Sequence, residues 1–253
     1  MSKIISIFNQ KGGVGKTTTN VNLCAGLALK GKKVLAVDID PQGNSTSGFG
    51  IEKNSLEFTI YDTIIDGYNI NNIIVDTEIK NLKVIPSNIQ LAGAEIELTK
   101  TKYREKTLKH ELNKLEEEFD FIFIDCPPSL GLLSLNALTA SNSVMIPIQC
   151  EYYALEGVSQ LIDTVKLVKK TLNQKIEIEG VILNMFDGRT NLSIQVVEEV
   201  KKYFKSKVYR TVIPRNIRLA EAPSYGQPIM LYDEKSKGCE AYNNLAKEII
   251  KSN

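Results

Sequence analysis

The feature that most constrains this chain is a glycine-rich stretch, residues 11–18 (KGGVGKTT), between a short apolar segment and a helical one. Residues 3–9 carry the branched apolar side chains of a buried strand, and residues 17–30 have the composition of a helix. In a strand–loop–helix turn of this kind, backbone N–H groups point at phosphate oxygens at the positive end of the helix dipole. The stretch therefore predicts a loop that holds the phosphates of a nucleotide.

The residues within this loop predict ATP and Mg²⁺ as cofactors. The pattern G-x-x-x-x-G-K-[ST] is met except that Gln10 takes the first glycine position. Lys16 is expected to contact the β- and γ-phosphates, and the Thr17 hydroxyl to bind Mg²⁺, a hard cation that prefers oxygen ligands. The predicted nucleotide-binding positions are Lys11, Gly12, Gly13, Val14, Gly15, Lys16, Thr17 and Thr18.

Two acidic residues follow predicted strands and are candidates for the same site. Asp125 ends the apolar run of residues 121–124, where a carboxylate can hold magnesium through water, and Asp40 is placed to orient an attacking water. A single acid at a strand end is as often a helix cap or turn residue. Two acids that converge on one phosphate loop favour the metal and catalytic roles.

The order of the remaining segments predicts an α/β fold, a mainly parallel twisted sheet with helices on both faces, formed by residues 1–253 as one domain. Apolar strands alternate with amphipathic helices, which is typical of parallel sheets with right-handed crossovers. Residues 41–59 are rich in Gly, Ser, Thr and Asn and predict a functional loop. Further strands are expected at residues 33–38, 82–86, 119–125, 143–148, 176–184 and 208–213, and helices at 60–65, 88–99, 104–117, 153–172, 191–204 and 239–251.

Composition excludes several other classes. No apolar run approaches the roughly 20 residues of a membrane-spanning helix, and the N-terminus lacks a signal-peptide pattern, so the chain is expected in the cytoplasm. Four scattered cysteines and one histidine form no C-x-x-C pair or transition-metal pattern. The net charge of +1 neither favours nor excludes a polyanionic partner.

Taken together, these motifs resemble the deviant Walker A motif and associated motifs of the ParA/MinD ATPases, and within that family the chromosomal ParA branch. The resemblance covers almost the whole chain. It is carried by residues 11–17 (KGGVGKT), 38–44 (DIDPQGN), 125–129 (DCPPS), 149–157 (QCEYYALEG), 189–192 (RTNL) and 214–224 (PRNIRLAEAPS).

The resemblance implies a homodimer that forms when ATP is bound, with Lys11 reaching across to the phosphates of the other subunit. Lys11, Lys16 and Asp40 would then be the catalytic residues, and Asn184, Pro214 and Asn216 would contact the adenine. It also implies a ParB-type partner, a replication initiator as a further partner, and association with the nucleoid.

A basic segment predicts a DNA-binding surface. Residues 201–218 contain seven lysines and arginines and no acidic residue. This segment begins in the helix expected at residues 191–204, and Arg189 precedes that helix. Charge alone more often indicates a solvated helix face. The family resemblance favours nonspecific binding to double-stranded DNA instead, and the candidate contacts are Arg189, Lys201, Lys202, Arg215 and Arg218.

Three rival functions remain open on the sequence. A MinD-like membrane-surface ATPase needs a basic amphipathic C-terminal helix with bulky apolar residues, whereas residues 242–253 are mixed in charge and lack Phe and Trp. A redox relative with an iron–sulfur cluster needs suitably placed thiolates, and Cys126 has no second cysteine in such a setting. A scaffold that binds nucleotide without hydrolysis would not need Asp40.

Overall fold

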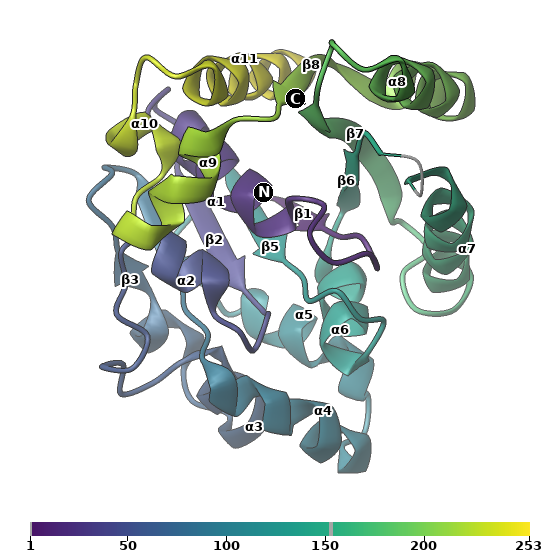
Figure 1. The fold of residues 1–253 in the computed structure, drawn as a ribbon. Helices are drawn as coiled ribbons and strands as arrows, with labels where there is room; N and C mark the ends of the chain where they lie inside the picture. Colours follow the sequence, from purple (N-terminus) through teal and green to yellow (C-terminus); the bar gives the residue numbers. More distant parts are fainter. Residues whose placement is uncertain (1, 152–153) are drawn as a thin grey trace.

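An eight-stranded sheet forms the centre of the molecule, with its strands in the order β3-β4-β2-β5-β1-β6-β7-β8. The computed structural model describes residues 2–151 and 154–253 (Figure 1). All neighbouring strands are parallel except the short edge pair β3 and β4. The strands are β1 (Lys3–Ile7), β2 (Val34–Asp38), β3 (Val75–Asp76), β4 (Leu82–Ile85), β5 (Phe121–Asp125), β6 (Ser143–Gln149), β7 (Glu177–Phe186) and β8 (Val208–Pro214).

Helices cover both faces of this sheet (Figure 1). On one face Phe121 and Phe123 of β5 pack in a core with α1 and α9–α11, and on the other Ile122 and Ile124 pack with α3–α8. Successive side chains of a strand point to opposite faces, so a strand buried on both sides is apolar throughout. The helices are α1 (Lys16–Ala28), α2 (Asn44–Gly48), α3 (Ile60–Asp66), α4 (Ala94–Glu97), α5 (Thr107–Leu112), α6 (Leu132–Ala140), α7 (Ala154–Thr171), α8 (Asn191–Phe204), α9 (Ile217–Glu221), α10 (Ile229–Tyr232) and α11 (Lys237–Ser252).

The predicted fold class is confirmed, and the differences lie in short elements. The sequence did not predict α6, which is buried nearly all round and so lacks the periodic stripe of a surface helix. It also did not predict α2 within the loop of residues 41–59. The start expected for α7 at Tyr153 lies outside the described residues.

Two predicted helices were too long. The helix expected at residues 88–99 is a single α-helical turn, α4, between two 3₁₀ turns. The helix expected at 104–117 is α-helical only in α5, and Leu115 is the one apolar residue among residues 113–118. Little apolar surface is therefore available there to hold another helical turn against the core.

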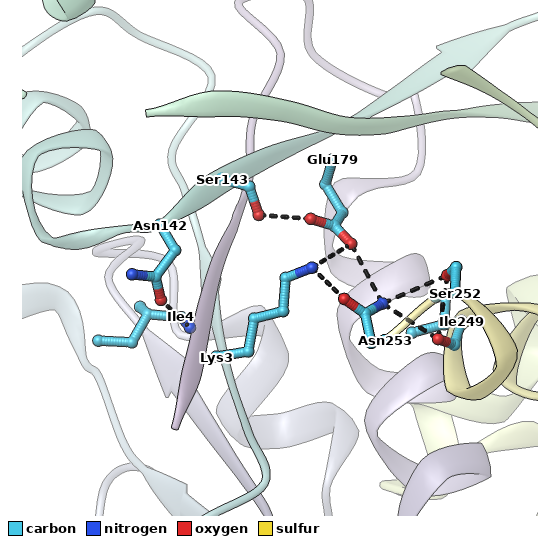
Figure 2. A network of polar contacts seen from close by, with 8 residues as sticks. All are labelled: Lys3, Ile4, Asn142, Ser143, Glu179, Ile249, Ser252 and Asn253. Carbon is cyan, nitrogen blue, oxygen red and sulfur yellow. Dashed lines mark hydrogen bonds and ion pairs between the residues drawn. The ribbon is translucent and has the colours of Figure 1, made fainter. Parts of the chain in front are cut away.

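A polar network closes the sheet at the amino ends of its strands (Figure 2). Lys3 of β1 forms an ion pair of 2.7 Å with Glu179 of β7, which also accepts a 2.7 Å hydrogen bond from the Ser143 hydroxyl of β6. Asn253 donates to the same Glu179 carboxylate and to the carbonyl of Ile249 in α11. These contacts fasten α11 to three strands at the edge of the sheet opposite their carboxyl ends.

Close packing between β7 and β8 gives a direct test of the fold. A Cβ atom on Gly180 would lie 2.4 Å from the Tyr209 ring. We expect Gly180→Ala to lower the free energy of unfolding by about 1–3 kcal/mol, because the buried ring has to shift. Chemical denaturation measures this change.

Gly157→Ala is the matched control, because it lies in α7 and no heavy atom of the residues that the structure describes lies within 4 Å of its added Cβ. It should raise stability by up to about 1 kcal/mol through helix propensity. Equal stability of the Gly180→Ala variant and the parent would contradict the packing of Tyr209 on β7.

Candidate nucleotide-binding site

The loop between β1 and α1 bends at glycines with left-handed backbone. Gly13 and Gly15 have φ of 73° and 91°, and a Cβ on Gly15 would lie 2.7 Å from the amide nitrogen of Asn184. Gly15 is also the N-cap of α1 and brings no side-chain cap, so the first N–H groups of this helix are left for a ligand. The loop thus has the form of an anion cradle.

Lys16 lies within this cradle, only 7% exposed, and its ammonium donates to the carbonyl of Lys11 at 3.2 Å. Burial lowers the pKa of Lys16, while the Asp125 carboxylate opposes that shift. An ammonium held out of water beside free N–H groups is placed to bind phosphate oxygens.

Asp125 joins three elements at the carboxyl end of β5. Its Oδ2 accepts hydrogen bonds from the hydroxyls of Thr17 and Ser45, each at 2.8 Å. Its Oδ1 is buried and has no hydrogen-bond partner in the described part of the chain. Burial, and then the nearby carboxylate of Asp38, raise the pKa of Asp125. A hydroxyl and an unpartnered carboxylate oxygen are ligands that suit Mg²⁺ directly or through water, so the predicted pair Thr17 and Asp125 fits the metal.

Asp38, at the end of β2, holds the loop that follows this strand in place. It is completely buried and accepts hydrogen bonds from the backbone N–H and the hydroxyl of Thr46, both at 2.8 Å. Burial is the main cause of its raised pKa. These bonds position the start of α2, which carries Ser45 to Asp125. The sequence predicted no role for Ser45. It placed Asp38 only within the motif of residues 38–44, which also contains Asp40.

Asp40 is 8% exposed at the wall of the cavity that contains Lys16. Its Oδ1 accepts from the backbone N–H of Gln42 at 2.9 Å, and its carbonyl accepts from the Ser87 hydroxyl at 2.8 Å. Both contacts hold the residue in place and leave Oδ2 without an intramolecular donor among the described residues.

Two adjoining cavities meet at this loop. A cavity of about 450 Å³ is lined by Gly12, Gly13, Lys16, Thr17 and Asp40, among others. A second, of about 310 Å³, is lined by Asn184, Pro214 and Asn216 with apolar neighbours from β8 and α9. Gly15, Thr18 and Met185 line both. The structure thus brings the residues expected at the phosphates and at the adenine into one continuous site.

Two residues of the loop, Lys11 and Val14, line neither of these cavities. Lys11 does not line the phosphate cavity of its own chain, but borders a small separate cavity with Asn9 and Gln149. Val14 is 2% exposed, and its carbonyl accepts a 2.9 Å hydrogen bond from the Asn184 amide. Its side chain is therefore buried, and Val14 lines the small cavity beside Lys11 rather than either cavity of the site.

The candidate DNA contacts lie in three places: Arg189 before α8, Lys201 and Lys202 in α8, and Arg215 and Arg218 after β8, the last in α9. Three of them have acidic partners: Arg189 pairs with Asp187, Lys202 with Glu199, and Arg218 with both Glu221 and Asp233. Lys201 and Arg215 have no ion pair in the part of the chain that the structure describes, and Arg215 also lines the second cavity. Much of the positive charge in this surface is locally neutralised.

Two structural observations concern the membrane and redox alternatives. Across residues 2–151 and 154–253 no helix combines the length and the apolar character needed to span a bilayer. The four cysteines, Cys24, Cys126, Cys150 and Cys239, are buried and unpaired, and burial raises the pKa of each thiol.

A parallel sheet covered on both faces, with a glycine-rich loop and its lysine after β1 and acids at the ends of β2 and β5, defines a P-loop nucleoside triphosphatase. The comparisons with known proteins agree with this class. A family model described as "AAA domain" matches residues 2–178. The sporulation initiation inhibitor protein Soj of Bacillus subtilis is 64% identical, over 98% of each chain.

One further relative and one solved structure are also similar to this chain over almost its whole length. The chromosome-partitioning ATPase Soj of Treponema pallidum is 49% identical, over 99% of this chain and 98% of its own. The crystal structure of cobyrinic acid a,c-diamide synthase from Mycobacterium smegmatis, with bound ADP and magnesium, has a TM-score of 0.87 and 35% identity, over 99% of this chain and 95% of that one. The chain belongs to the Soj/ParA family of chromosome-partitioning ATPases.

The buried Asp125 carboxylate predicts a conflict between stability and function. Because its pKa is raised in the folded state, its contribution favours the fold at low pH and is lost as pH rises through the folded pKa. We expect Asp125→Asn to stabilise the nucleotide-free protein by about 1–2 kcal/mol at about pH 8, and by less at about pH 5, where the parent carboxyl takes up a proton.

Thermal unfolding at both pH values measures this effect. Asp163→Asn is the control, since Asp163 is exposed and pairs only with Lys166 on the surface. An Asp125→Asn variant that melts below the parent at the higher pH would contradict the prediction.

Proposed function

We propose that this chain, as one P-loop domain over residues 1–253, binds ATP with Mg²⁺ and uses its hydrolysis to control a dimer that holds DNA during chromosome segregation. The observation that carries the proposal is the separation of the two loop lysines. Lys16 lines the phosphate cavity of its own chain, and Lys11 lies outside it. A lysine beside the loop but outside its cavity is free to complete the cavity of a second subunit.

The residues around the phosphate cavity divide the chemistry of hydrolysis. Lys16 and the N–H groups at the start of α1 bind the phosphate oxygens, and Thr17 with Asp125 would hold magnesium, which supplies further positive charge for the phosphates. Asp40, fixed by Gln42 and Ser87, accepts a hydrogen bond from water and orients it. Lys11 of the second subunit adds positive charge that is present only in the dimer.

Asn184 supports adenine as the base. Its Nδ2 donates to the Val14 carbonyl and, at 3.3 Å, to the Thr19 hydroxyl, so the orientation of the amide is set. Its Oδ1 is then a buried acceptor to which none of the described residues donates. The exocyclic amino group of adenine is a donor, whereas guanine carries an acceptor oxygen at the corresponding position, so this site favours ATP over GTP.

The basic surface supports a nonspecific hold on double-stranded DNA by the ATP-bound dimer, which associates the protein with the nucleoid. Two copies of the surface side by side double the positive charge, and phosphate contacts carry no sequence information. Hydrolysis separates the copies and releases the DNA. The name of the Treponema relative, a chromosome-partitioning ATPase, supports this output.

Partners belong to the same proposal. A ParB-type protein stimulates turnover, and a replication initiator is a further partner. The name of the Bacillus relative, an inhibitor of sporulation initiation, supports a second role in developmental control. The membrane-surface alternative is less well supported, because α11 packs its apolar residues Tyr242, Leu245 and Ile249 into the core beside α1.

Substitution of the three catalytic residues should separate their roles. Asp40→Ala should slow ATP hydrolysis by at least about 100-fold with little change in ATP affinity, because the carboxylate acts on water. Lys16→Ala should lose ATP binding. Lys11→Ala should still bind ATP as a monomer but fail to dimerise. Phosphate release, equilibrium dialysis and analytical ultracentrifugation measure the three effects.

Lys80→Ala, an exposed lysine away from both cavities, controls for loss of charge. ATP-dependent dimers of Lys11→Ala at the parent concentration would refute the role of Lys11, and hydrolysis by Asp40→Ala at the parent rate would refute that of Asp40.

DNA binding should depend on ATP and fall steeply with salt, because each phosphate contact contributes roughly 0.9 to the log–log slope. The double variant Arg189→Ala/Arg218→Ala should weaken binding and reduce this slope. Lys201→Ala should have a larger effect than Lys202→Ala, since the Lys202 charge is shared with Glu199. Fluorescence anisotropy over a salt series measures both.

The charge-matched control is Lys100→Ala/Lys102→Ala, next to α4 at the end of the molecule away from α8 (Figure 1). If this pair weakens DNA binding as much as the Arg189/Arg218 pair, or if binding by the ATP form is insensitive to salt, the proposed surface is wrong.

A further inference from the structure

The end of β7 contains a bulge beside the nucleotide-binding site. Leu183 pairs with Val212 of β8, and Phe186 pairs with Pro214, so β7 advances three residues where β8 advances two. The extra residue falls at positions 184–185, between two paired positions. Bulges in sheets turn side chains away from the directions that regular alternation would give them.

Met185 has a left-handed backbone within this bulge, with φ of 55°. Residues with a Cβ are strained in that region, and glycine or asparagine is the usual choice. Hydrogen bonds on both sides of Met185 keep this conformation in place. The Asn184 carbonyl accepts from the backbone N–H of Cys150, just after β6, and the Phe186 carbonyl accepts from the backbone N–H of Arg215, both at 3.0 Å. A methionine held in this conformation at a ligand cavity indicates that its side chain has a use there.

The two cavities of the site share only three lining residues, Gly15, Thr18 and Met185. In a bound nucleotide the sugar joins the base to the phosphates, so the residues common to both cavities surround the position of the sugar. Gly15 has no side chain and Thr18 has a short polar one. Met185 alone offers a long, adaptable apolar side chain at this junction.

We propose that Met185 is a nucleotide-binding residue that packs its side chain against the ribose, and that the left-handed bulge of β7 is the device that directs it there. The same bulge lets consecutive residues serve one ligand: Asn184 faces the base cavity and the loop, and Met185 faces the junction. The inference rests on the proposed binding of ATP and assigns the contact to its sugar.

The test separates the side chain from the backbone. ADP with Mg²⁺ is titrated by calorimetry into the nucleotide-free parent and into Met185→Ala, Met185→Gly and Met185→Leu, and each unliganded protein is melted. Met185→Ala and Met185→Gly should each bind ADP about three- to tenfold more weakly, because the apolar contact is lost. Met185→Leu should stay within about twofold of the parent, since it keeps the apolar volume.

The stability of the unliganded variants should depend on the backbone conformation of residue 185 instead. Without ligand, Met185→Gly should melt above Met185→Ala, because only glycine is unstrained at this φ. Tyr103→Gly is the matched control: Tyr103 also has a left-handed backbone, with φ of 57°, but lines neither cavity, so its ADP affinity should equal that of the parent.

ADP affinity of Met185→Ala within twofold of the parent overturns the contact, and a melting temperature of Met185→Gly below that of Met185→Ala overturns the role of the bulge. A parent protein that fails to bind ADP refutes the proposed function itself, which distinguishes the two failures.

Discussion

The hydrogen bonds to the Asp125 carboxylate are the interaction on which the site depends. Through one oxygen this residue holds the Thr17 hydroxyl of α1 and the Ser45 hydroxyl of α2, so three elements distant in sequence meet at a single buried atom. The second oxygen has no hydrogen-bond partner among residues 2–151 and 154–253. A buried carboxylate is costly, and the pKa of Asp125 stays raised although the Thr17 and Ser45 hydroxyls lower it. The fold thus keeps a buried carboxylate oxygen that a bound cation, or water held by it, would satisfy.

The arrangement of the sheet makes this possible. β2 and β5 are parallel neighbours in register, with Asp38 opposite Asp125, and both ends open toward the loop after β1. Burial raises the pKa of both carboxyls, and a neighbouring negative charge adds to this, that of Asp38 at Asp125 and that of Asp40 at Asp38. Asp38 is satisfied by Thr46 and so serves the structure, whereas Asp125 is left half satisfied for the ligand. Identical residue types at equivalent positions acquire different roles from their hydrogen-bond partners.

Sequence reasoning predicted those parts of the molecule that depend on local pattern. The sheet class, the loop, and the pairing of Thr17 with Asp125 follow from apolar runs that end in glycines or acids. It failed where the determinant is tertiary. α6 has no amphipathic stripe because it is buried nearly all round, and Ser45 has no local signal because its partner lies 80 residues away. The ion pairs of Arg189 and Arg218 were missed for a different reason: basic residues were counted within residues 201–218, and the acidic partners Asp187, Glu221 and Asp233 lie outside that range.

The contact between Asn184 and the phosphate loop is also tertiary, and it explains why the loop needs Gly15. Asn184 pairs with Gln149 of β6 just before the left-handed Met185, and its amide donates to the Val14 carbonyl and occupies the space where a Cβ on residue 15 would lie. The glycine that a phosphate-loop pattern explains by close approach of a ligand is therefore required here by a second strand as well. A substitution at Gly15 would disturb the base cavity and the phosphate cavity together, because the Asn184 contact connects them. The two halves of the nucleotide site form one mechanical unit, held at the point where β7 departs from the regular geometry of the sheet.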